Sequence, residues 1–263
     1  MKIYFEYFKS VVSHKKSVFK KCWRRGLKKE AIMHDMSKFL PSEFIPYAKW
    51  FNGPHGVKIK DKLDSMSEEI RIDFEFNQRK FLDAVDKHYK RNKHHWNHWA
   101  ESDLFYESIP QNYLVEILCD WESVGERYGN TAQEYYLRNY FQIKMSNENR
   151  WRLEMIMGFR KPNDVDWDPL FNMTLMELLE FNLTKGTDTS EETALNMLNH
   201  KFREVNDRYK IKTADLLLES YKRNKQIQEG TLLYLFIKVD VNPNRIDIYN
   251  FQLSVQYIKK LGR

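Results

Sequence analysis

The 263-residue chain is 42% hydrophobic and 30% charged, which predicts one large globular domain or two modest ones. It contains only 9 Gly, 7 Pro and 2 Cys, which argues against long low-complexity segments, a disulfide framework and a cysteine-based zinc site. The sequence has neither an 18-residue apolar run nor a signal-peptide core, so we expect a cytoplasmic protein without a membrane partner.

The net charge of +6 is concentrated at the start of the chain. Residues 2–29 hold ten Lys or Arg side chains and a single acid, Glu6. Two interpretations stay open. The stretch is either a solvated helix face or a positive field that attracts anionic substrates or nucleic acid.

Helices are expected over most of residues 1–158. One helix face is indicated by side chains spaced four, three, four and four residues apart, namely Tyr7, Val11, His14, Val18 and Cys22. Gly26 would end that helix. A second helix is expected over residues 28–38, before Pro41.

Residues 51–60 are expected to form a loop, because Gly53, Pro54 and Gly56 favour turns. The next helix would start near Ser67 and run to about residue 90, with His88 on its apolar face. Further helices are expected after Pro110 and over residues 131–140 and 147–157. The helix after Pro110 has one face made of Tyr113, Ile117, Asp120 and Val124.

Residues 159–169, with two prolines and three aspartates, are expected to connect a domain over 1–158 to a C-terminal domain over 170–263. Helical patterns follow at 170–184, 190–207 and 213–227, and residues 232–251 could form a β-hairpin. The predicted fold class is therefore mainly α. The C-terminal domain shows no catalytic motif, so its role as an oligomerisation unit, a lid or a partner-binding domain stays open.

The adjacent pair His34-Asp35 predicts a metal site. The pair offers an imidazole and a carboxylate to one point, and His14, His88 and Asp120 fall on the apolar faces of three other helices. A buried carboxylate without a partner is costly, so an inward Asp calls for a cation. Nitrogen and oxygen ligands of this kind suit a divalent metal, and such a metal activates water.

The chain order of these residues resembles the HD superfamily of metal-dependent phosphohydrolases. The pattern runs through His14, His34-Asp35, His88, His94-His95 and Asp120, and Lys38 gives the HDxxK form of the motif. The runs HDMSKFLPSEFIPY, NKHHWNHW and CDWESVG are also similar to an uncharacterised bacterial and phage group described only as a domain of unknown function. The resemblance covers about residues 5–145.

This resemblance implies an HD-type helical bundle with a C-terminal helical extension, and one or two divalent ions (Mn, Fe, Co, Ni, Zn or Mg). It implies that a core metal is held by His14, His34, Asp35 and Asp120. His88, His94 and His95 match residues that hold a second metal or contact phosphate. The neighbours His94 and His95 cannot both do so from a regular helix, and His95 is slightly favoured.

The implied activity is hydrolysis of a phosphate ester, most naturally a nucleotide or similar small molecule, by metal-activated water. Lys38 is the best candidate for a phosphate contact. Glu43 either orients the attacking water or caps the helix after Pro41, and capping is favoured. Arg91 and Lys93 either bind substrate phosphate or are solvated surface charges.

Two other functions stay open. The chain could be a non-catalytic module that binds nucleic acid through its basic N-terminal helix, or binds a protein. It could also be a diiron oxygenase, because imidazole and carboxylate ligands suit iron. Homo-oligomerisation is compatible with each of these functions.

Overall fold

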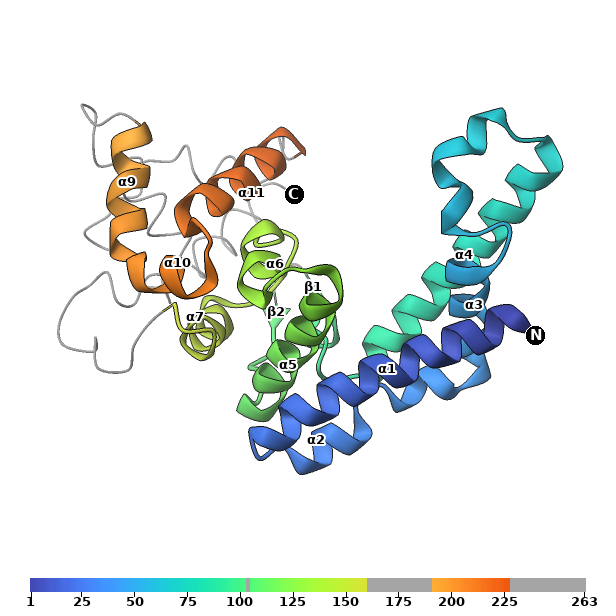
Figure 1. The fold of residues 1–263 in the computed structure, drawn as a ribbon, viewed down its shortest axis with the longest axis horizontal. Coiled ribbons are helices and arrows are strands. Elements are labelled where there is room, and N and C mark those ends of the chain that lie inside the picture. The colour runs from blue at the N-terminus through green and yellow to red at the C-terminus, as the bar shows by residue number, and fades with distance from the viewer. Residues whose placement is uncertain (103–104, 160–190, 228–263) are drawn as a thin grey trace. The chain divides into compact units, whose positions relative to one another are not determined.

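Helices dominate the part of the chain that this computed structural model describes, residues 1–102, 105–159 and 191–227 (Figure 1). The predicted mainly α fold is confirmed. The described elements are α1 (Lys2–Arg24), α2 (Lys28–Met33), η1 (Met36–Phe39), α3 (Pro41–Asn52), η2 (Val57–Ser65), α4 (Glu68–Arg91), η3 (Trp96–Trp99), β1 (Ala100–Ser102), β2 (Phe105–Tyr106), α5 (Gln111–Tyr128), α6 (Ala132–Arg138), α7 (Asn147–Ile156), α9 (Glu191–Lys201), α10 (Arg203–Tyr209) and α11 (Thr213–Ile227). Strands β1 and β2 pair with each other.

The chain forms two compact units. The first comprises Met1–Ala100 and Ile109–Arg127, and the second comprises Glu101–Ser108 and Tyr128–Arg263. All candidate ligands of the predicted metal site belong to the first unit. The predicted domain boundary near residue 158 and the connector over 159–169 stay predictions.

Helix α1 buries the face that its apolar spacing predicts. Tyr7, Val11, Val18 and Cys22 are each at most 5% exposed, and the helix ends just before Gly26, whose φ of 79° suits glycine. Val18 and Cys22 pack in a cluster with Ala31 of α2 and Cys119 of α5. This packing brings α2 and the more distant α5 to the same side of α1.

The second predicted helix is shorter than expected. It ends at Met33 instead of residue 38, because His34 is not helical (φ −47°, ψ 127°) and Asp35 is left-handed (φ 55°, ψ 20°). The chain then resumes as the short 3-10 helix η1. These two non-helical residues are the His-Asp pair of the predicted metal site, so the helix is interrupted at two candidate metal ligands.

Aromatic side chains fill the core between α1, α3 and α4. Tyr7 and Tyr47 lie 6.0 Å apart between ring centroids, and Trp50 stacks on Phe81 at 5.2 Å. Val11, Ala48 and Ala84 complete the buried cluster, and their small or β-branched side chains let the helices approach closely. The core fixes the positions of α1 and α4, which carry two of the candidate ligands.

The loop predicted over residues 51–60 is only partly correct. Helix α3 continues to Asn52, and η2 begins at Val57. Between them, a Cβ atom at Gly56 would lie 2.0 Å from the Trp50 carbonyl oxygen, so only glycine fits this close backbone approach.

The second unit is also helical where it is described. Helix α6 begins with a capping box between Thr131 and Glu134, and helix α11 covers residues 213–227, as predicted. The helix predicted over 190–207 is divided into α9 and α10 at Phe202. The helix predicted over 170–184 and the hairpin over 232–251 lie outside the described residues. None of the described helices is long and apolar enough to cross a membrane.

Candidate metal centre

The candidate ligands converge from four helices of the first unit and their flanking segments. Their origins are His14 on α1, His34 and Asp35 between α2 and η1, His88 on α4, His94 and His95 after α4, and Asp120 on α5. All of these side chains are buried except those of His14 and His95, which are half-buried. The candidate metal ligands predicted from the sequence therefore lie close together in the structure.

A backbone turn aims His34 and Asp35 at the same point. The non-helical His34 and left-handed Asp35 conformations point the two neighbouring side chains inward together. The Lys15 ammonium group donates to the backbone oxygens of Ile32 and His34, both at 2.6 Å, and so fastens the turn to α1. An Asp tolerates the left-handed region better than most residues, at a modest energetic cost.

The first group of ligand atoms surrounds His14 Nε2. It lies 2.9 Å from Asp120 Oδ1, 3.4 Å from His34 Nε2 and 3.7 Å from Asp35 Oδ2. His34 Nε2 is also 3.6 Å from Asp35 Oδ2 and 3.7 Å from Asp120 Oδ1. Two atoms bound about 2.1 Å from one ion lie roughly 3.0–3.4 Å apart, so these spacings are close to those of a shared metal.

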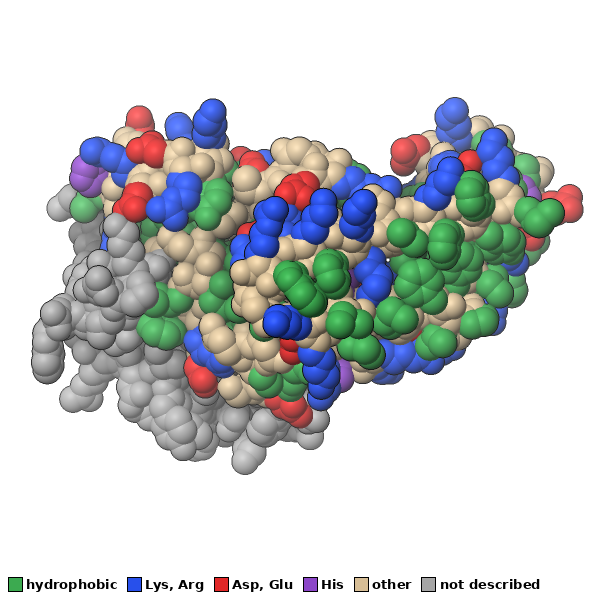
Figure 2. Space-filling view, turned by 60° about the horizontal axis from the view of Figure 1, so that its bottom comes forward, with side chains coloured by type: hydrophobic (Ala, Val, Ile, Leu, Met, Phe, Trp, Pro, Cys, Tyr) green, Lys and Arg blue, Asp and Glu red, His purple; other side chains and the backbone are tan. Residues whose placement is uncertain are grey.

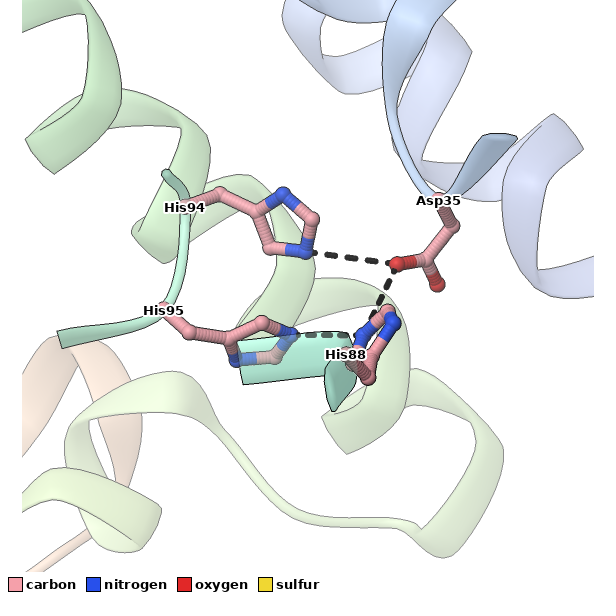
Figure 3. Close-up of side chains that lie close together, drawn as sticks. All are labelled: Asp35, His88, His94 and His95. Carbon is pink, nitrogen blue, oxygen red and sulfur yellow. Dashed lines mark hydrogen bonds and ion pairs between the residues drawn. The ribbon is translucent and has the colours of Figure 1, made fainter. Parts of the chain in front are cut away.

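The second group surrounds the other oxygen of Asp35 (Figure 3). Asp35 Oδ1 lies 3.3 Å from both His88 Nε2 and His94 Nε2, and His95 Nε2 lies 2.9 Å from His88 Nε2. The chain is not helical between Asn92 and His95, so both neighbouring histidines reach the group. Asp35, His88, His94 and His95 could hold a metal ion, as could His14, His34 and Asp120.

Two buried atoms of the second group have unused bonding capacity. Asp35 Oδ1 and His94 Nε2 have no hydrogen-bond partner of acceptable geometry among the described residues, although they lie 3.3 Å apart. Buried polar atoms are nearly always satisfied, because an unsatisfied one costs about 1–3 kcal/mol. A cation between these two atoms would satisfy both, so the residues present fit a metal ion.

Two buried glutamates orient the histidine rings. Glu43 Oε2 lies 2.9 Å from His88 Nδ1, and Glu116 Oε1 lies 3.0 Å from His34 Nδ1 and 3.3 Å from His94 Nδ1. A carboxylate at Nδ1 keeps the proton there and leaves Nε2 free to bind a metal. Each of these three rings therefore presents its Nε2 atom to the ligand groups.

The buried carboxylates favour positive charge at the site. Burial raises the pKa of Asp35, but the charges of Lys38 and His34 outweigh it and hold that pKa well below the usual range. For His94, burial acts in the opposite direction and lowers the pKa, but hydrogen bonds with Asp35 and Glu116 outweigh it and raise the pKa to about 10. In the metal-free protein, protonated His94 and Lys38 therefore balance the carboxylate charge, and a divalent ion would replace the proton on His94 Nε2.

One family model matches residues 4–180, more than half of the chain, and this range includes every candidate ligand. The chain belongs to the DUF5662 family. That family has no known function. No curated protein and no solved structure matches the chain.

Among the other residues singled out in this DUF5662 chain, Lys38 lies at the edge of the ligand groups. Its Nζ atom is 2.6 Å from Asp35 Oδ2, and its side chain is 19% exposed. The position suits a phosphate contact, because a lysine ammonium has two more protons to donate. That role stays a prediction.

Glu43, predicted either to orient water or to cap α3, lies in a network of hydrogen bonds. It accepts hydrogen bonds from Ser37 Oγ at 2.8 Å and Arg91 Nη1 at 2.7 Å, besides its contact with His88. No side chain caps the N-terminus of α3, where capping by Glu43 was expected. Glu43 therefore holds the ring of His88, a candidate ligand, and its role in orienting water stays a prediction.

Arg91 and Lys93 also have partners within the first unit of this DUF5662 member. Arg91 donates to Glu43 and to Ser42 Oγ. Lys93 Nζ lies 6.0 Å from the ring centroid of Trp99 and 5.8 Å from that of Tyr113. The substrate-binding roles of both cations stay predictions, and these contacts give each of them a structural role.

Sequence reasoning missed Glu116, although a signal was present. Glu116 lies one helical turn before Asp120, so the two acids share a face of α5, and both are buried. The apolar spacing that revealed Asp120 would also have revealed Glu116. By contrast, the histidines left out of the prediction have other partners: His55 pairs with Asp73, His98 with the Lys90 carbonyl and His200 with Arg203.

Proposed function

We propose that this DUF5662 chain is a metal-dependent phosphohydrolase of the HD type that holds two divalent ions. The observation that carries the proposal is the buried Asp35 carboxylate, whose two oxygens face two different groups of ligand atoms. A carboxylate shared in this way could serve as a ligand of two ions, and many phosphate-cleaving enzymes use two.

When bound, the ions would supply an activated water molecule and draw charge from the phosphoryl oxygens. The protein's own contribution is to hold the ligand atoms in place. His14 and Asp120 are the partly accessible members of the first group, at 15% and 12% side-chain exposure, so substrate would approach from their side. Lys38, next to Asp35, would contact the substrate phosphate. The proposed substrate is a nucleotide or similar small phosphate ester.

The first experiment is metal analysis of the purified protein beside Asp35→Ala. We expect about two equivalents of metal in the wild type and a large loss in the variant. Asp73→Asn is a matched control, because Asp73 also pairs with a histidine, His55, but lies outside the ligand groups. A wild type with no more metal than Asp35→Ala would contradict the proposal.

The second experiment is a turnover screen with nucleotides and simple phosphate esters, in the presence of Mn, Co, Mg, Fe, Ni or Zn. Metal-dependent phosphate release is expected for at least one substrate. No release with any ion would contradict the hydrolase assignment. Iron retained after purification, together with oxygen uptake, would instead favour the diiron oxygenase.

A second candidate function, nucleic-acid binding, is favoured by the outer face of α1. Phe5, Phe8, Phe19 and Trp23 are exposed there, and Lys9 Nζ lies 4.3 Å from the ring centroid of Phe5. Figure 2 shows a face of the molecule on which hydrophobic side chains lie among Lys and Arg. Aromatic rings beside cations can stack on bases while the cations contact phosphates.

This candidate is tested by measuring single-strand DNA affinity at several salt concentrations. Simultaneous substitution of Lys9, Lys16 and Lys20 by Glu should weaken binding and flatten its salt dependence. The same change at Lys58, Lys60 and Lys62 of η2 is the control. Equal effects of both triple variants, or no binding by the wild type, would exclude a nucleic-acid site on α1.

A further inference from the structure

Besides Asp35 itself, Glu116 is a described carboxylate that contacts histidines of both ligand groups. Its Oε1 atom lies 3.0 Å from His34 Nδ1 and 3.3 Å from His94 Nδ1. His34 presents its opposite nitrogen, Nε2, to His14 and Asp120, whereas His94 presents Nε2 to Asp35 Oδ1. A single oxygen atom therefore lies behind one ligand of each group.

The surroundings of Glu116 make it responsive to both rings. Its side chain is 4% exposed, so water does not compete effectively for the carboxylate. Among the described residues, its hydrogen bonds and ion pairs are those with His34 and His94. The orientation of the carboxylate therefore depends on the two rings, and the orientation of each ring depends on the carboxylate.

Glu43 provides an internal comparison. It contacts one candidate ligand, His88, and is itself held by Ser37 and Arg91. Glu43 is thus fixed from outside the site and serves the second group alone. Glu116 serves both groups and lacks such an external anchor among the described residues.

We propose that Glu116 couples the two metal positions, so that an ion in one group favours an ion in the other. This inference rests on the proposed pair of ions. His34, with an ion at its Nε2 atom, would donate a stronger hydrogen bond from Nδ1 to Glu116. The fixed carboxylate then holds the His94 ring, and the second ion binds with less loss of conformational freedom. Glu116 is in this sense a positioning residue.

The coupling is tested by titrating metal-free protein with Zn²⁺ or Co²⁺ against a chromophoric chelator, which gives the affinities of both binding steps. The variants are Glu116→Ala, Glu116→Gln and Glu43→Ala. Loss of an outer carboxylate typically lowers metal affinity about 10- to 100-fold. We expect Glu116→Ala to weaken both steps and Glu43→Ala to weaken one. Glu116→Gln should fall between wild type and Glu116→Ala, because its amide oxygen can still accept a hydrogen bond.

Asp120→Asn separates coupling from simple structural damage. In the wild-type background, this change to the first group should also weaken the second ion. In the Glu116→Gln background, the additional weakening of the second ion should be smaller. Glu116→Gln keeps the shape of the side chain, so this comparison holds even if Glu116→Ala fails to fold.

Two results would overturn the coupling while leaving the proposed pair of ions intact. One is a Glu116 variant that weakens a single binding step, as Glu43→Ala does. The other is an Asp120→Asn effect on the second ion that is the same in both backgrounds. A wild-type protein that binds fewer than two ions would overturn the coupling and the proposed function together.

Discussion

Replacement of Lys15 by methionine tests whether α1 holds the turn that carries His34 and Asp35. Lys15 Nζ donates to the backbone oxygens of Ile32 and His34, both at 2.6 Å. Methionine keeps most of the aliphatic stem and removes both donors. The turn would then depend on its remaining backbone hydrogen bonds, such as His34 N to Glu30 O at 2.8 Å.

The expected cost follows from the two contacts. A hydrogen bond from a charged donor contributes about 1.5–3 kcal/mol, and less where water can replace it. The contact with Ile32 is exposed and the contact with His34 is half-buried, so the His34 contact should dominate. We therefore expect the free energy of unfolding to fall by about 2–3 kcal/mol. If half of that cost falls on the orientation of the ligands, metal affinity falls roughly 10-fold.

The assay combines urea unfolding of the metal-free protein with a chelator-competition titration. Lys16→Met is the matched control, because Lys16 is the next residue on α1, is exposed and makes no ion pair with a described residue. The reasoning would be refuted if Lys15→Met and Lys16→Met had the same stability and the same metal affinity.

Three further predictions concern charge, catalysis and the second unit. The pKa of His94 is raised to about 10, so its stabilising contribution to the metal-free protein is complete below about pH 6.5 and is lost as the pH rises toward 10. In urea unfolding between pH 7 and 9, the contribution of His94 to the free energy of unfolding should fall by about 1.4 kcal/mol per pH unit. Metal affinity should rise with pH, because a ligating histidine must be neutral. A His94→Gln variant that keeps the same pH slope would contradict this assignment. Lys38→Met should retain metal but lower kcat about 100-fold with a substrate found in the screen, and unchanged kcat would remove Lys38 from the proposed phosphate contact. Asn206→Ala leaves the Thr213 backbone N–H and hydroxyl without their acceptor, so calorimetry should show a loss of about 1–3 kcal/mol while the metal content stays unchanged; a loss of bound metal would show that the effect is not confined to the second unit.

Helical periodicity predicted most of what positions the site. The spacing of apolar residues located the faces of α1, α4 and α5, and with them the inward positions of His14, His88 and Asp120. This succeeded for α1 and α4 because each buries one face, and burial imposes a period of 3.6 residues on the sequence. Helix α5 is buried on several sides, and Val124, which the spacing placed on the same face as Asp120, is exposed. The same argument could not locate the end of α2, because the conformations of His34 and Asp35 depend on tertiary contacts such as the one from Lys15.

The residues that position the ligands were harder to predict than the ligands themselves. Glu43 was considered for water orientation or capping, and Glu116 was missed. A search for metal ligands looks for side chains that face one point, whereas Glu43 and Glu116 contact Nδ1, on the far side of the histidine rings. Which nitrogen of a histidine faces a partner depends on ring orientation, and sequence spacing carries no information about that.

At Asp35, the left-handed backbone favours glycine, whereas the proposed metal site requires a carboxylate. At a φ of 55°, glycine would relieve backbone strain of about 1 kcal/mol, but it would remove the carboxylate that faces both ligand groups. Asp35→Gly would relax the backbone, but it would also leave the Lys38 ammonium and the protonated His94 ring without their buried counter-charge. The strained backbone is therefore tolerated because the charges around it require a carboxylate at this position.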